Sequence, residues 1–288
     1  MRRGNYELAW QVCAEALAER DPATRDDPSQ PYHLRWVWDG SPFDDRHVLV
    51  RCYHGLGDTL QFARYLPLLA ERAASVTLEG PPRLGGLLRH LPGVTRFVPF
   101  DPAHPLPPSE CDFEIMELAF ALRIPPSRVP MPYLHAAPAP LPAGCVALCY
   151  EAGEWDPARS VPQERLTELC RERPCLSLVP GATELPVLNP EGCPLDMGLT
   201  ASWIAGAELV ITVDTMIAHL AGAMNKPTWL LLKHDPDWRW PPDATGSDWY
   251  PSMRLYVQES PGDWGSMIDR VAANLRMETL ALKAESGR

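Results

Sequence analysis

The segment His54-Gly55-Leu56-Gly57-Asp58-Thr59-Leu60-Gln61 places a carboxylate on a glycine turn between an apolar run and a helical one. Two glycines let the backbone turn sharply and approach a ligand closely. Asp58 at the start of a helix lies beside unsatisfied N–H groups and the positive end of the dipole, which favour its ionised form. Such a carboxylate can accept a proton from a substrate hydroxyl. A structural interpretation stays open, because Asp58-x-x-Gln61 is an ordinary capping box.

A second polar turn, Val213-Asp214-Thr215-Met216-Ile217-Ala218-His219-Leu220, also joins an apolar run to a helical one. Asp214 and Thr215 lie beside the first N–H groups of that helix, which form a ready anion site. His219 falls one turn further along, on the same face as Thr215. The three residues suit the diphosphate of a nucleotide-sugar. The alternative is a capping aspartate plus a histidine satisfied inside a helix–sheet contact, and the recurrence of an acidic turn in both halves favours function.

Two loops add charge and aromatic surface. Asp156-Pro-Ala-Arg159-Ser160-Val-Pro162 contains an arginine that can neutralise a leaving diphosphate, or else is a solvated loop residue. The loop Asp235-Pro-Asp237-Trp238-Arg239-Trp240 carries aromatic side chains that suit stacking on a sugar or a base. Asp235-x-Asp237 matches a metal-binding pattern by form only, since no further ligand stands nearby in sequence. We therefore predict no metal.

Alternating short apolar runs and helical patterns must position these turns. Before the first turn, a helix is expected over 6–20 and a connection to residue 42. In the first half the pattern predicts strands over 47–53, 76–78 and 94–100 and helices over 59–72 and 83–90. In the second half it predicts strands over 146–150, 176–179, 209–213 and 228–232 and helices over 163–171, 201–207, 215–223 and about 263–282. Such alternation indicates right-handed βαβ units with parallel sheets.

Prolines crowd the stretch from Pro125 to Pro142 and exclude a regular element there. The sequence thus predicts a helical segment and connection over 1–42 and two α/β domains over 43–140 and 141–288, with the last helix free to pack back on the first domain. Ligands of open α/β sheets bind outside the carboxyl ends of the strands. A cleft between two such domains is the expected site.

The composition narrows the classes of partner. The 288 residues carry 26 basic and 37 acidic side chains, a formal charge of −11, so a polynucleotide is a poor ligand. No apolar run reaches the roughly 20 residues of a membrane span, although peripheral membrane contact stays open. The eight cysteines form no C-x-x-C pair, and with no signal-peptide core this predicts reduced thiols in a cytoplasmic protein.

In their order and wording these motifs resemble the heptosyltransferase-like glycosyltransferases of family 9, and more closely the glycosyltransferase-like domains that follow tetratricopeptide repeats in bacteria. The segments that carry the likeness are 55–67, 159–162, 209–222, 236–240 and 249–255. The opening helix around Arg3-Gly4-Asn5-Tyr6 looks like the remnant of a final repeat helix. His54 stands where relatives often have a small or acidic residue, and the loop 151–159 looks shortened.

The resemblance implies a GT-B fold and an inverting glycosyltransferase that uses a nucleotide-diphosphate sugar as co-substrate, without a metal or other cofactor. The acceptor hydroxyl would belong to a glycan, a lipid-linked glycan or a protein. Asp58 falls on the family's catalytic base. The donor-binding residues expected are Gly57, Thr59, Arg159, Ser160, Met197, Asp214, Thr215 and His219, with Met197 lining the nucleobase pocket. The acceptor or sugar side is expected to include His54, Gln61, Arg64, Trp238 and Arg239.

Two other interpretations of the same motifs remain. An epimerase or hydrolase with this fold would process the donor without any acceptor. A catalytically degenerate domain would bind a nucleotide-sugar or a glycan without turnover.

Overall fold

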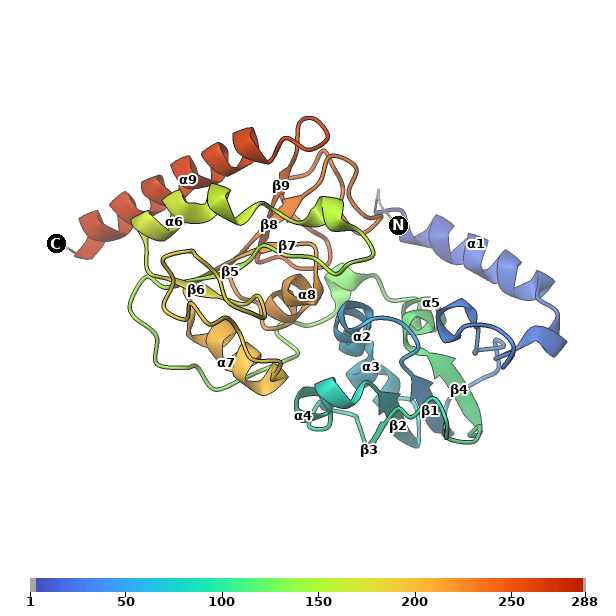
Figure 1. The fold of residues 1–288 in the computed structure, drawn as a ribbon. Coiled ribbons are helices and arrows are strands. Elements are labelled where there is room, and N and C mark those ends of the chain that lie inside the picture. Colours follow the sequence, from blue (N-terminus) through green and yellow to red (C-terminus); the bar gives the residue numbers. More distant parts are fainter. Residues whose placement is uncertain (1–3, 287–288) are drawn as a thin grey trace. The chain divides into compact units, whose positions relative to one another are not determined.

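A computed structural model describes residues 4–286 of the chain, without the side chains of residues 282–286. The described chain divides between Leu134 and His135 into two compact units, unit 1 before that point and unit 2 after it. The division lies inside the proline-rich stretch 125–142. Each unit is an α/β structure around its own parallel sheet (Figure 1), which confirms the predicted fold class.

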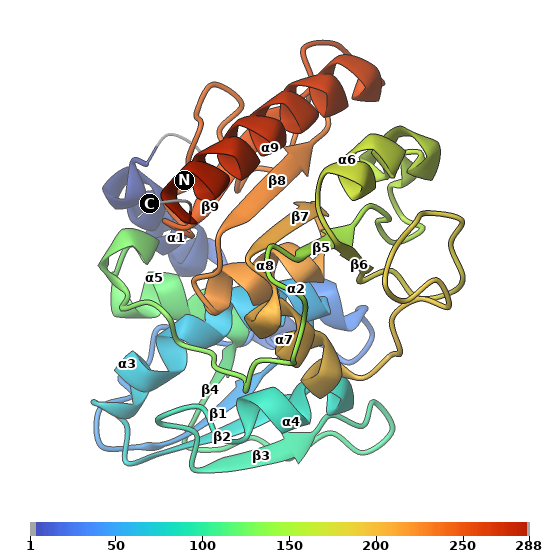
Figure 2. The same cartoon turned by 90° about the vertical axis from the view of Figure 1, so that its left-hand side faces the viewer.

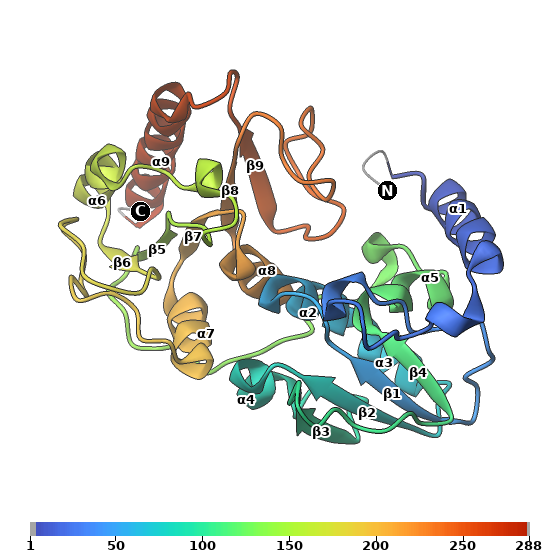
Figure 3. The same cartoon turned by 45° about the vertical axis from the view of Figure 1, so that its right-hand side comes forward.

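Unit 1 contains four parallel strands in the order β3-β2-β1-β4 (Figure 3). Their bounds are β1 His47–Arg51, β2 Ser75–Gly80, β3 Arg96–Pro99 and β4 Cys111–Glu114. The helices are α1 Tyr6–Glu19, α2 Leu56–Phe62, α3 Leu66–Ala70, α4 Gly85–Leu88 and α5 Leu118–Leu122. Short 3-10 turns link them: Pro22–Thr24, Tyr32–Leu34, Ala63–Tyr65, Pro82–Leu84, Ile115–Glu117 and Pro126–Arg128.

The single helix predicted over 59–72 is wrong: α2 and α3 are separate, with a 3-10 turn between them. Pro67 lies in the first turn of α3. Proline has no N–H to continue a helical ladder and its ring crowds the carbonyl four residues earlier, so the chain tightens before it. The prediction also lacks β4, because Cys-Asp-Phe-Glu shows no apolar run. The structure buries Asp112 and Glu114 of that strand as hydrogen-bond partners.

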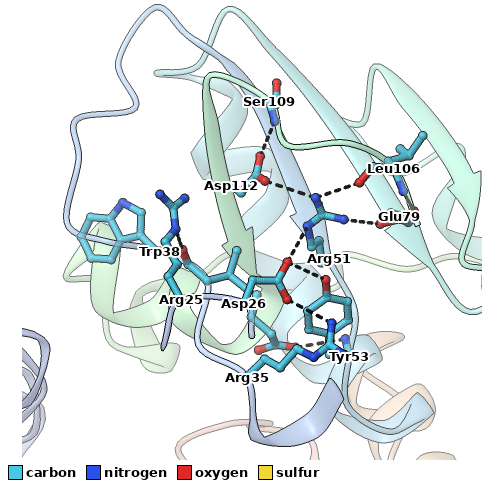
Figure 4. Close-up of polar contacts among 12 residues, drawn as sticks. Arg25, Asp26, Arg35, Trp38, Arg51, Tyr53, Glu79, Leu106, Ser109 and Asp112 are labelled. Atoms are coloured by element: carbon cyan, nitrogen blue, oxygen red, sulfur yellow. Dashed lines mark hydrogen bonds and ion pairs between the residues drawn. The ribbon is translucent and has the colours of Figure 1, made fainter. Parts of the chain in front are cut away.

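Arg51, at the carboxyl end of β1, ties the unit 1 sheet together (Figure 4). Its Nη1 donates to Glu79 on β2 (2.8 Å), and its Nη2 lies 3.2 Å from Asp112 on β4 and donates to the Leu106 carbonyl (3.0 Å). Asp26, from the connection after α1, accepts the hydroxyl of Tyr53 (3.2 Å) beside them. Buried charges are tolerated only when they are paired. The end of β1 is therefore fixed where the chain enters the glycine turn.

Glu117 anchors the connection between α1 and β1. Its carboxylate accepts the backbone N–H groups of Val37 (3.1 Å), Trp38 (2.8 Å) and Glu114 (2.8 Å). Burial nevertheless raises the pKa of Glu117 to about 7, against the lowering effect of those three donors. Arg20, 3.9 Å away, supplies a nearby positive charge. The connection is thus held by a carboxyl that titrates near neutral pH.

Unit 2 contains five parallel strands in the order β6-β5-β7-β8-β9. Their bounds are β5 Val146–Cys149, β6 Cys175–Ser177, β7 Leu209–Val213, β8 Thr228–Leu232 and β9 Met253–Val257. The helices are α6 Thr167–Glu172, α7 Met197–Gly206, α8 Met216–Ala223 and α9 Trp264–Ser286, with 3-10 turns at Pro157–Arg159 and Gln163–Leu166. α9 packs against α6 and β9 (Figure 1, Figure 2).

The unit 2 prediction is confirmed for the four strands it named and lacks β9. Met253–Val257 is the edge strand next to β8, and its exposed Arg254 forms an isolated antiparallel bridge with Gly246. Its five residues follow a long aromatic loop, so their apolar character does not distinguish them from that loop. All eight cysteines of the chain are free, as predicted.

We expect the stability of unit 1 to fall as pH rises through neutrality. The pKa of Glu117 in the folded state, about 7, lies above its value of 4.5 without burial. The folded state therefore binds the extra proton, so the stabilisation is complete below pH 4.5 and is lost as pH rises through 7. The loss amounts to roughly 3 kcal/mol at about 1.4 kcal/mol per pKa unit.

Thermal unfolding between pH 5 and 8 of the wild type and of Glu117→Gln checks this expectation. The amide in the variant cannot titrate, so the difference between the two proteins isolates the contribution of this carboxyl. A difference that stays constant across that range would show that Glu117 is ionised throughout.

Candidate functional site

The glycine turn of unit 1 begins α2 earlier than the capping box Asp58-x-x-Gln61 would require. Gly55 is the N-cap, Leu56 is the first helical residue, and Asp58 occupies the third helical position. Oδ2 of Asp58 accepts the backbone N–H of Gly55 (3.1 Å), so the box pairs Asp58 with Gly55. The half-buried carboxylate lies in the first turn, where the unsatisfied N–H groups favour negative charge.

His54 precedes this turn and pairs with a residue that the sequence does not single out. Its Nδ1 lies 3.0 Å from Oε1 of Glu114, at the carboxyl end of β4. Glu114 is 2 % exposed and also accepts the N–H groups of Tyr53 (3.3 Å) and Met116 (2.8 Å). The carboxylate is therefore fixed, and it orients the imidazole. No motif links residues 54 and 114, because only the pairing of β1 with β4 brings them together.

Gln61 and Arg64, predicted for the acceptor or sugar side, are both 0 % exposed. Nε of Arg64 donates to the Gln61 carbonyl (2.8 Å), and its guanidinium lies over the ring of Tyr133 at 5.2 Å. Thr59 is buried as well, while Gly57 keeps partial exposure. Within unit 1 the exposed polar surface of the turn therefore comes from His54 and Asp58.

The turn after β7 brings three predicted residues of unit 2 together. Thr215 is the N-cap of α8, its hydroxyl accepting the N–H of Ile217 (3.2 Å), so Asp214 lies one residue before the cap. Nη1 of Arg159 donates to the backbone carbonyl of Asp214 (2.7 Å). Across the sheet edge, the Cys149 thiol lies 3.7 Å from the Thr215 hydroxyl. The loop after β5 is thereby attached to the turn after β7.

Burial raises the pKa of Asp214, and four side chains near this carboxyl also change its pKa. The nearby Trp240 side chain lowers the pKa, Asp237 raises it, and Arg159 and Arg239 both lower it. Two guanidinium groups thus act on one carboxyl at the end of β7. In a chain with a net charge of −11, two arginines therefore lie at this turn, and each is close to an aspartate of its own loop.

His219 lies inside unit 2 with an exposure of 5 %. Its Nδ1 is 3.0 Å from the hydroxyl of Tyr250, and its ring stacks on Trp240 with centroids 5.8 Å apart. The helix of His219 also carries Gly222, which faces the Tyr250 ring so closely that a Cβ there would overlap ring carbons. The aromatic loop is therefore packed onto α8, and it holds the imidazole.

The loop after β8 supplies Trp238 and Arg239. The guanidinium of Arg239 lies 4.5 Å from the Trp238 ring centroid, and its Nη1 donates to Asp237 (2.8 Å). Trp238 packs edge-on against Trp249 at 5.9 Å. Asp237 is thus a partner of Arg239.

Ser160 and Met197 have separate local roles. The Ser160 hydroxyl accepts the N–H of Ala152 (3.0 Å) and braces the loop after β5. Met197 begins α7, next to the N-cap Asp196, and is 5 % exposed. It contributes little open surface to a ligand.

Asp156 and Lys233, which the sequence did not single out as ligands, also belong to the unit 2 cluster. Lys233 directly follows β8, and its Nζ donates to Oδ2 of Asp156 (2.8 Å). The same oxygen lies 3.8 Å from Nε of Arg159, whose guanidinium stacks on Trp155 at 4.3 Å. The predicted parallel strands could have indicated both residues, because residues that follow neighbouring parallel strands gather at the same end of the sheet.

A hollow of about 640 Å³ lies in unit 1 beside α1, lined among others by Asn5, Trp10, Arg123 and Arg128. None of the described residues that line it belongs to the predicted site. Across residues 4–286, no helix has the length and apolar character required to cross a membrane.

Known structures with a similar fold are glycosyltransferases. The family 9 glycosyl transferase from Veillonella parvula superposes on 83 % of this chain and 99 % of its own, with a TM-score of 0.55 and 13 % identity. The Escherichia coli ADP-heptose lipopolysaccharide heptosyltransferase II covers 82 % and 99 %, with a TM-score of 0.55 and 14 % identity. The dodecameric iron-containing heptosyltransferase TibC, in complex with ADP-D-beta-D-heptose, covers 83 % and 78 %, with a TM-score of 0.59 and 12 % identity.

The chain has the GT-B fold of these glycosyltransferases. In sequence, 95 residues are 34 % identical to Protein FlbA of Caulobacter vibrioides, a match that covers 31 % of this chain and only 15 % of that protein. No family model matches the chain. The likeness in structure thus extends over most of the GT-B chain, whereas the likeness in sequence is confined to a part.

We expect Gly222→Ala to destabilise unit 2, because the new methyl group would overlap the buried ring of Tyr250. Overpacking of this kind costs about 1–3 kcal/mol. Thermal and urea unfolding measure the loss. Gly265→Ala, where the nearest atom beyond the helix is Nη1 of Arg165 at 3.6 Å, is the matched control and should be neutral. Equal behaviour of the two variants would mean that the aromatic loop adapts freely.

Proposed function

We propose that the protein is an inverting glycosyltransferase that moves a sugar from a nucleotide-diphosphate donor to an acceptor hydroxyl. The observation that carries the proposal is the turn after β7, where Arg159 is bonded to the Asp214 carbonyl and Thr215 caps α8. A helix N-terminus with a guanidinium beside it is suited to a diphosphate. The shared fold adds support, as does TibC, which is described in complex with ADP-D-beta-D-heptose.

In this proposal unit 2 holds the donor. Arg159, Thr215 and the N–H groups at the start of α8 stabilise the charge that builds on the diphosphate as it leaves. His219, held by Tyr250 and Trp240, is one turn further along the same helix. The aromatic surface of Trp238, backed by Arg239, suits the sugar or the base.

Unit 1 supplies the base. Asp58 takes the proton from the acceptor hydroxyl while that oxygen attacks the anomeric carbon from the face opposite the diphosphate. One base is sufficient, because a single displacement inverts the centre without a covalent intermediate. The reaction needs no metal in this proposal, since fixed positive groups neutralise the leaving diphosphate. The acceptor is a hydroxyl of a glycan, a lipid-linked glycan or a protein.

A thermal-shift screen with nucleoside diphosphates and their sugars identifies the donor, because a ligand that binds only the native state raises the unfolding temperature. Product analysis with donor alone and with donor plus acceptor then separates transfer from hydrolysis or epimerisation. Binding without turnover on any acceptor would make the protein a nucleotide-sugar binding module instead.

We expect Asp58→Asn to lower turnover at least ~100-fold, the contribution typical of a general base, and to leave donor affinity unchanged. An amide has the size of the carboxylate but cannot accept the proton. Turnover and donor affinity are measured on the same preparations. Asp101→Asn, at an exposed loop aspartate of unit 1, is the control and should behave as wild type. Near-normal turnover of Asp58→Asn would remove Asp58 from the mechanism.

A further inference from the structure

Lys233 is placed at the sheet edge that carries the proposed donor site. β7 and β8 are parallel, with Val213 opposite Leu231, so Asp214 and Lys233 leave their strands at the same edge. β5 is parallel to β7 on the other side, with Cys149 opposite Thr212, and the loop after it carries Asp156 and Arg159. Three consecutive strands of the sheet thus deliver Arg159, the Asp214 turn and Lys233 to one place.

Asp156 occupies the position between the two cations. Its Oδ2 accepts a hydrogen bond from Nζ of Lys233 at 2.8 Å and lies 3.8 Å from Nε of Arg159. Arg159 is held in turn by its bond to the Asp214 carbonyl (2.7 Å). The hydrogen bond from Lys233 is the first cause of a lowered pKa for Asp156, so the carboxylate is ionised at neutral pH. One oxygen anion is therefore already bound between a lysine and an arginine.

Two cations that hold one oxygen anion resemble a phosphate-binding site in which the Asp156 carboxylate takes the place of the phosphate. Lysine presents a compact point charge on a flexible stem and is a common phosphate ligand. The Lys233 side chain is 33 % exposed, so it can leave the carboxylate and reach a ligand. The Asp156 side chain is 17 % exposed, so water also reaches the pair and screens it in part. A diphosphate offers more negative charge than one carboxylate and can replace it.

We propose that Lys233 is a further ligand of the donor's diphosphate, and that Asp156 is an internal counter-ion which the diphosphate displaces. The inference rests on the proposed function, and it assigns roles to two residues of the same site. It predicts opposite effects for the two members of one ion pair. If Asp156 only positioned Arg159 and Lys233, removing its charge would weaken anion binding instead.

The test is calorimetric titration of the whole chain with inorganic pyrophosphate and, separately, with UDP, ADP and GDP. For Lys233→Gln we expect about tenfold weaker binding of pyrophosphate and of the nucleotide that binds, the effect of losing one charged hydrogen bond. For Asp156→Asn we expect roughly two- to fivefold tighter binding, the strength of a partly exposed ion pair that water screens. Thermal unfolding confirms that each variant is folded.

Lys226→Gln is the matched control. Lys226 lies just before β8, at the opposite end of the same strand, where its Nζ donates to the Ala205 carbonyl (3.0 Å). This variant loses the same charge from the same unit and should change pyrophosphate affinity less than twofold. Equal losses for Lys226→Gln and Lys233→Gln would reduce the effect to net charge and overturn the role of Lys233. Weaker binding by Asp156→Asn would overturn the role of Asp156.

The two probes separate this inference from the proposed function. If pyrophosphate binding depends on Lys233 but no nucleotide binds more tightly than pyrophosphate, the anion site is supported and a nucleotide-sugar donor is not. If a nucleotide binds equally well to wild type and Lys233→Gln, the nucleotide donor is supported and the inference about Lys233 is overturned. Failure of wild type to bind pyrophosphate and every nucleotide overturns both.

Discussion

The parallel register of each sheet is the constraint on which both candidate turns depend. The strands of a parallel sheet all run in the same direction, so the chain must cross back to the amino ends before each new strand begins. The segments that follow the strands therefore gather at the carboxyl ends. In unit 2 these ends collect Arg159 after β5, Asp214 after β7 and Lys233 after β8. In unit 1 they place Glu114, at the end of β4, against His54, just beyond β1.

Burial divides the ion pairs of the molecule into two kinds. Arg51 and its partners Glu79 and Asp112 are almost fully buried, and breaking such a set leaves an uncompensated charge, so they hold β1, β2 and β4 in register. The pair of Lys233 with Asp156 is partly exposed and screened by water. The first kind is a fixed part of the fold. The second can exchange partners, which is what an anion site requires.

Local patterns were sufficient to predict the α/β architecture, the strands β1, β2, β3, β5, β6, β7 and β8, and the two turns that follow β1 and β7. They could not predict β4 or the partner of His54, because Glu114 is recognisable only through strand pairing. Local patterns also did not predict where α2 begins, because Gly55 rather than Asp58 is its N-cap. Charge clusters such as Asp156 with Lys233 join residues 77 positions apart and need the sheet to be known.

The proposed mechanism assigns donor binding and proton transfer to different units of the chain. Arg159, the Asp214 turn and Lys233 all belong to unit 2, so in the proposed mechanism diphosphate binding is a property of that unit. Asp58 belongs to unit 1, where one of its oxygens also accepts the Gly55 N–H. A substitution in unit 1 that stops transfer should therefore leave donor affinity intact. Donor affinity lost through a change at Asp58 would mean that the base and the donor site are not separable in this way.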